Sequence, residues 1–108
     1  MSAIELKLIP HQSEEGLAYQ HLRICLTRAD GIITPQDLSQ LQLPKGINST
    51  QGVILEGRGP IWLYAYLTHE CHATAWVGCY DPRLGGAVVV ESHIREVSVG
   101  EIIKIQLP

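Results

Sequence analysis

The sequence GVILEGRGPIWLYAYLTHECHATAWVGCY, residues 52–80, contains three successive structural signals. The apolar run 52–56 predicts a short strand, which the Gly-Arg-Gly-Pro segment at 57–60 ends. The proline of that segment is well placed to open a helix running to about residue 72, because proline is favoured at the first helical position. Residues 73–80 then return to a strand pattern. We therefore expect a strand, a helix and a second strand in direct succession.

The preceding part of the chain predicts a hairpin and a short helix. Residues 4–9 alternate apolar and polar side chains, as a half-buried strand does, and residues 19–26 fit a second strand paired with the first. Thr34, the proline after it and Asp37 are typical of a helix start, for a helix that ends near Leu41.

The following part of the chain predicts a loop and two more strands. Residues 81–86 contain the loop signals, and residues 87–90 and 102–107 have strand patterns. The whole order predicts an α+β fold: a single small domain, residues 1–108, whose mixed β-sheet carries two helices on one face.

Composition narrows the classes of function. At 108 residues and 45% hydrophobic side chains the chain is one globular domain, and eight lysines and arginines against eleven acids give a net charge of −3. A protein that wraps duplex DNA needs a broad basic surface, so we expect no duplex partner, whereas a small anion held by two or three arginines fits. Three cysteines without a C-x-x-C pair argue against a disulfide framework and a standard zinc site. No signal peptide or membrane segment is visible, so the expected compartment is the cytoplasm.

The second predicted helix is apolar on nearly all sides. Trp62, Tyr66 and His69 cluster on one side, and Glu70 is its only charged residue. One small sheet covers one face of a helix, so the aromatic side predicts a subunit interface, most simply that of a homodimer.

The junction between the strand and this helix is a candidate anion site. Gly57 and Gly59 let the backbone approach a ligand, the helix N-terminus favours negative charge, and Arg58 adds a guanidinium for phosphate. The alternative is an ordinary tight turn with an exposed arginine.

Histidines and an aspartate follow the junction. His69 and His72 are spaced to share a helix face, where they could ligate a metal or act as a base, or simply interact with the helix dipole. Asp81 ends the next strand beside Arg83, where catalytic residues are common, although turn aspartates are common there too. His93 closes the strand after that. Together these residues suit a hydrolase or lyase that acts on phosphodiesters.

Four motifs carry a family resemblance. GRGPIWL, H-x-x-H, YDPRLG and VVV-x-SH occur in that order within residues 52–93. This region resembles the small manganese-dependent CRISPR ring nucleases of type III systems. The resemblance implies a Mn²⁺-dependent enzyme, or one using another divalent metal, that hydrolyses the second messenger cyclic tetra-adenylate. It also implies dimers that stack head to tail around the ring, as tetramers or filaments, and some relatives continue into an ATPase-like domain.

The motifs and the resemblance together assign roles to individual residues. The catalytic pair is His72 and Asp81. The expected metal ligands are His72, Asp81 and His69. The expected ligand-binding residues are Gly57, Arg58, Gly59, Arg83 and His93.

Other functions remain open from the sequence. A module that binds a cyclic oligoadenylate without cleaving it needs the same arginines but no reactive His72 or Asp81. A metal-dependent exonuclease acting on short RNA tails could use the same site. A cysteine hydrolase built on Cys71 is disfavoured, because helical geometry points that side chain away from both imidazoles.

Overall fold

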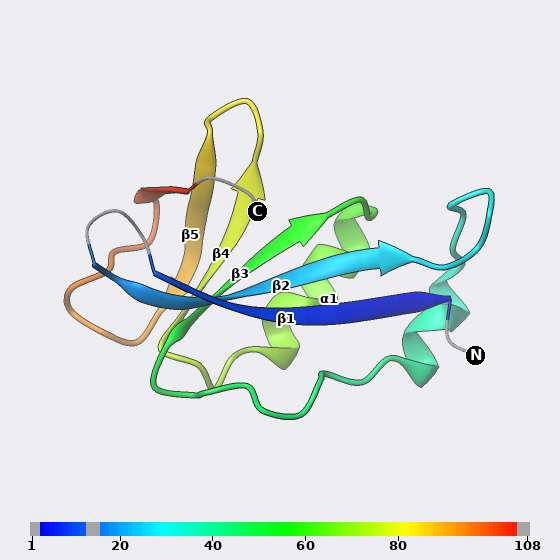
Figure 1. The fold of residues 1–108 in the computed structure, drawn as a ribbon, viewed down its shortest axis with the longest axis horizontal. Helices are drawn as coiled ribbons and strands as arrows, with labels where there is room; N and C mark the ends of the chain where they lie inside the picture. The colour runs from blue at the N-terminus through cyan, green and yellow to red at the C-terminus, as the bar shows by residue number, and fades with distance from the viewer. Residues whose placement is uncertain (1–2, 13–15, 106–108) are drawn as a thin grey trace.

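The computed structural model describes residues 3–12 and 16–105, which form a six-stranded sheet and two helices (Figure 1). The elements in chain order are β1 (Ile4–Gln12), β2 (Ala18–Leu26), the 3₁₀ helix η1 (Pro35–Gln40), β3 (Gly52–Gly57), α1 (Ile61–Glu70), β4 (Trp76–Asp81), β5 (Gly86–Ser92) and β6 (Ile102–Lys104). The predicted order of strands and helices is confirmed, and the part of the last predicted strand at 106–107 lies outside the described residues.

The strands pair in the order β1-β2-β3-β4-β5-β6, and the sheet is mixed. β1 and β2 form the predicted antiparallel hairpin, β2, β3 and β4 are mutually parallel, and β5 and β6 are antiparallel to their neighbours. The sheet twists strongly, so that β4 and β5 stand almost upright in Figure 1 while β1 and β2 run almost horizontally. Because β2, β3 and β4 are parallel, their carboxyl ends lie at one edge and their amino ends at the opposite edge.

One face of the sheet packs against both helices. Leu22, Val53 and Val77 project from the strands into this core, where Leu63 and Leu67 of α1 are fully buried. Leu38 of η1 and the adjacent Leu41 pack into the same cluster. The α+β fold with two helices on one face is therefore confirmed. Each fully buried leucine contributes about 1.5–3 kcal/mol to this side of the fold.

The opposite face holds a second core beneath the segment that joins β5 to β6. Trp76 is 1% exposed and packs there with Ile54, Val89 and Val97. The indole lies directly over the start of β3, since a Cβ added at Gly52 would stand 1.9 Å from the ring. Glycine at this position is therefore a requirement of the Trp76 packing.

Helix α1 ends earlier than predicted, and β4 begins later. The expected helix to about residue 72 stops at Glu70, and residues 71–75 form turns. The hydroxyl of Thr74 donates to the carbonyl of Cys71 at 2.7 Å, and the His72 amide donates to the carbonyl of His69 at 3.1 Å. These tighter contacts replace the helical pattern and place His72 outside α1. Neither described helix has the length and apolar composition that crossing a bilayer requires.

Candidate functional site

The predicted site residues fall into two groups at opposite edges of the sheet. His72 precedes the amino end of β4 (Trp76–Asp81), whereas Asp81 is the last residue of that strand. At about 3.3 Å per residue, the strand separates them by more than about 15 Å. Within one subunit the structure therefore does not bring His72 and Asp81 to a common metal ion.

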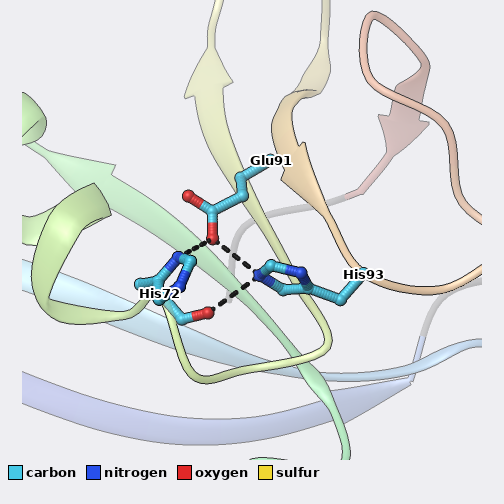
Figure 2. A group of neighbouring side chains, drawn as sticks. All are labelled: His72, Glu91 and His93. Carbon is cyan, nitrogen blue, oxygen red and sulfur yellow. Dashed lines mark hydrogen bonds and ion pairs between the residues drawn. The ribbon is translucent and has the colours of Figure 1, made fainter.

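At the amino end of β4 three side chains converge, here called the His–Glu–His cluster: His72, Glu91 and His93 (Figure 2). Oε1 of Glu91 lies 2.7 Å from Nδ1 of His72 and 2.9 Å from Nε2 of His93. The same Nε2 lies 3.0 Å from the backbone carbonyl oxygen of His72, and the two rings meet edge to face. Glu91 thus bridges the two imidazoles.

The fold explains why these residues meet. The turn that ends α1 carries His72, and the antiparallel register pairs Glu91 of β5 with Val77, close to that turn. A β-bulge between Val77 and Gly78 shifts the pairing at this point. Beyond the strand, the His93 amide donates to the Ala75 carbonyl at 2.9 Å, which fixes the position of the second histidine.

The cluster has the chemistry of a cation site. Burial alone would raise the pKa of Glu91, but hydrogen bonds from His93 and His72 outweigh it and lower the pKa, so the carboxylate is ionised at neutral pH. The possible ligand atoms of the three residues all lie within 4.8 Å of one another, and His72 is 68% exposed. Two imidazoles and a carboxylate with accessible positions suit a divalent first-row transition metal. The residues present therefore fit a metal such as Mn²⁺.

The residues of this cluster are not the same set as the metal ligands predicted from the sequence. Among the described residues, the group of possible ligands includes His72 but neither His69 nor Asp81. His69 stays on the last turn of α1, so the expected shared helix face with His72 is wrong. Glu91 was not predicted. Its position two residues before His93 was the available signal, because residues i and i+2 of a strand share a face.

At the carboxyl ends of β3 and β4, the Gly-Arg-Gly-Pro junction leads into the N-terminus of α1. Gly57 has φ +129°, and an added Cβ would stand 2.5 Å from the Ile24 carbonyl oxygen, so the fold itself requires glycine there. The Pro60 carbonyl accepts the Leu63 amide at 3.0 Å and begins the helix. Exposed Arg58 lies between the two glycines of this junction.

Two cavities meet at this junction. The first, the arginine cavity, has a volume of about 600 Å³ and is lined by Arg23, Arg28 and Arg58 with Asp30 and Glu56. The second, the tyrosine cavity, has a volume of about 440 Å³, and Tyr64, Tyr80 and Asp81 line it. Gly57 and Gly59 line both, so the predicted ligand-binding residues 57–59 lie where the two cavities join.

Asp81 and Arg83 form a compact turn beside the tyrosine cavity. The carboxylate accepts the Arg83 backbone amide at 2.9 Å and its guanidinium at 3.1 and 3.3 Å. The Arg83 side chain bond is the main cause that lowers the pKa of Asp81, so the carboxylate is ionised. Asp81 therefore has the contacts of a turn aspartate as well as a position at a cavity.

The aromatic side of α1, predicted to be a subunit interface, is covered in part within the subunit. Trp62 and Tyr66 are partly buried against the first core.

Cys71, the nucleophile of the cysteine hydrolase considered above, is buried, and this burial raises the pKa of its thiol to about 11. A thiol with that pKa is almost wholly protonated at neutral pH, which argues against the cysteine hydrolase.

Comparison with known proteins adds two similarities. Residues 26–104 match the model of a family described as CRISPR-associated protein (Cas_csx3). A protein of Aquifex aeolicus (strain VF5), described as uncharacterized, is 45% identical over 75 residues, which make up 67% of this chain and 68% of that protein. The family match contains the junction, both histidines of the cluster, Glu91, Asp81 and Arg83.

Proposed function

Because the chain belongs to the CRISPR-associated Cas_csx3 family, we propose that it is a manganese-dependent ring nuclease. In this proposal it cleaves cyclic tetra-adenylate to linear products and so switches off type III CRISPR signalling. The expected activity and ligand come from the family resemblance of the motifs within residues 52–93. The observation that carries the proposal is the His–Glu–His cluster, with its three possible ligands within 4.8 Å.

His72, Glu91 and His93 would hold the metal. A bound divalent cation supplies positive charge that polarises a phosphoryl oxygen. His72 directs Nδ1 to Glu91, so its Nε2 is the nitrogen left either to ligate the metal or to exchange a proton with the substrate. The carboxylate orients this ring, as acidic partners of metal-binding histidines commonly do.

The opposite edge would grip the phosphates. Arg58 is exposed beside the arginine cavity, Arg83 is exposed beside the tyrosine cavity, and the N-terminus of α1 opens between them. Guanidinium groups bind phosphate through two parallel hydrogen bonds, and a helix N-terminus attracts anions. This edge therefore suits successive phosphates of a small cyclic nucleotide.

Head-to-tail stacking of dimers would join the two edges. In such a stack the His72 edge of one dimer faces the Asp81 edge of the next, with the ring between them. The catalytic pair predicted from the motifs would then form between subunits. This arrangement accounts for two motif residues that lie at opposite ends of one strand.

The direct test is incubation with cyclic tetra-adenylate, with and without Mn²⁺, followed by chromatography of the products. We expect His72→Ala and Asp81→Asn to reduce cleavage at least ~100-fold, the lower range for loss of a general acid or base. Both should retain ring affinity within about tenfold. His69→Ala is the matched control, with a smaller loss, because His69 lies outside the cluster.

The same assay separates the alternative functions. Tight ring binding without cleavage under any divalent metal would support a sensor module instead. Faster removal of nucleotides from linear oligoadenylate than opening of the ring would support an exonuclease. A folded His72→Ala variant that cleaves at the wild-type rate would refute the role of His72.

Mixing variants tests the pairing between subunits. If His72 and Asp81 act across an interface, a mixture of His72→Ala and Asp81→Asn proteins contains some interfaces with both native residues. We expect partial recovery of cleavage in the mixture, and none in either variant alone. Absence of recovery after subunit exchange would contradict a site shared between subunits.

A further inference from the structure

A charged group with no role assigned so far joins the middle of β2 to the carboxyl end of β3. Nε2 of His21 is 2.6 Å from Oε1 of Glu56, and Nε of Arg23 is 3.0 Å from the same oxygen. His21 is 1% exposed and Glu56 is 15% exposed at the side chain. The parallel register aligns Arg23 with Glu56, so pairing of the two strands builds this contact directly.

The protonation states of this group follow from its partners. A carboxylate can only accept, so Nε2 of His21 carries the hydrogen and donates it. Burial lowers the pKa of His21 and outweighs the opposing effect of its hydrogen bond to Glu56. His21 is therefore a neutral donor at neutral pH. Oε1 of Glu56 accepts from both His21 and Arg23 and is held in one position.

Arg23 is held in a way that leaves most of its donors available. Its ion pair uses Nε, and its two terminal amino groups make no hydrogen bond among the described residues. Arg28, which lines the same cavity, instead uses both terminal amino groups on Asp37, at 2.9 and 3.0 Å. Arg23 thus lines the arginine cavity, as Arg58 does, with a side chain that is 30% exposed and with terminal amino groups that are not used by its ion pair.

Stability alone gives a poor reason for this arrangement. A partly buried ion pair such as Arg23–Glu56 often contributes little net stability, because removing the charges from water costs about as much as their attraction returns. A carboxylate that fixes one end of an arginine and leaves the other end open resembles the support of a binding residue. The geometry therefore favours a ligand for the free end.

We propose that Arg23 binds a phosphate group of the nucleotide ligand in the arginine cavity, with Glu56 and His21 as its positioning residues. The inference rests on the proposed function for the identity of the ligand. It adds a third phosphate-binding arginine to Arg58 and Arg83. Bidentate binding through the terminal amino groups is the chemistry expected of this orientation.

The test measures binding by calorimetry with two probes, cyclic tetra-adenylate and inorganic pyrophosphate. We expect Arg23→Ala to weaken binding of both at least tenfold, and less so as salt increases. Lys45→Ala is the matched control: it removes one positive charge from an exposed loop position and should have little effect. Wild-type affinity in the Arg23→Ala variant would overturn the inference.

A double-mutant cycle tests the positioning role. Glu56→Gln retains the shape and an acceptor oxygen but removes the charge, and we expect a three- to tenfold loss of affinity. In the Arg23→Ala background the same change should have no further effect. An equal loss in both backgrounds would show that Glu56 does not act through Arg23. Should Glu56→Gln fail to fold, His21→Gln, which retains a donor, is compared with His21→Leu for binding.

The two probes separate this inference from the proposed function. Pyrophosphate binding that depends on Arg23, without binding or cleavage of the ring, would refute the ring nuclease and support the phosphate site. Ring cleavage with unchanged binding in Arg23→Ala would refute the phosphate site alone. Binding of neither anion by the wild type would overturn both.

Discussion

Replacing Glu91 by glutamine should weaken cation binding at the His–Glu–His cluster by about ten- to a hundredfold. Glu91 bridges both imidazoles through one oxygen, at 2.7 and 2.9 Å. Removing the acidic partner of a metal-binding histidine typically weakens metal binding about ten- to a hundredfold. This range corresponds to a loss of about 1.4–2.7 kcal/mol of binding free energy.

The assay is titration of the protein with Mn²⁺, following the electron paramagnetic resonance signal of the free ion. Glu5→Gln is the matched control, because it makes the same change at an exposed position on β1, away from the cluster. It should bind Mn²⁺ as the wild type does. Equal affinity in Glu91→Gln and wild type would refute the reasoning, and the cluster would then be a hydrogen-bonded surface group without a metal.

Three further predictions concern stability against acid, assembly, and stability against urea. Because folding lowers the pKa of Glu91, its ionised carboxylate contributes to the free energy of unfolding in full above the unfolded-state pKa, and this contribution is lost as the pH falls below about 4.5. The free energy of unfolding of Glu91→Gln should therefore fall less steeply in acid than that of the wild type. An unchanged dependence on pH would contradict this. Tyr66→Glu should dissociate the predicted dimer in sedimentation velocity, since it places a charge on the aromatic side of α1, and an unchanged size would remove that side from the interface. Gly57→Ala should lose at least about 2 kcal/mol in urea unfolding, from left-handed φ and a contact at 2.5 Å, and clearly more than Gly85→Ala, which has φ +65° and no atom within 4 Å.

Local signals in the sequence were sufficient for the order of elements. Alternation along 4–9 and the glycines and proline at 57–60 are properties of neighbouring residues, and the structure follows them. The end of α1 was not predictable in the same way. It depends on the Thr74 hydroxyl, which lies within hydrogen-bond distance of the Cys71 carbonyl and of the carbonyl of Trp76, the first residue of β4.

The candidate site was predictable in part, for a related reason. His72, Asp81 and Arg83 stand out by residue type and motif, and the predicted strand at 73–80 already separates the first from the others. Glu91 joins His72 only through the register of β5 against β4 and the bulge at Val77. Strand register is a property of the whole sheet, and the residues near Glu91 do not determine it.

The His–Glu–His cluster and the arginine cavity, at opposite ends of the parallel strands, depend on strand pairings that differ in sequence separation. The His–Glu–His cluster needs only the β4–β5 hairpin and the turn before it, whose members are close in sequence. The arginine cavity needs β2 against β3, where partners such as Tyr19 and Gly52 are far apart in the chain. Closing such long loops costs more entropy and is slower, so we expect this pairing to form late and to open early. On partial unfolding, the arginine cavity should therefore be lost before the His–Glu–His cluster.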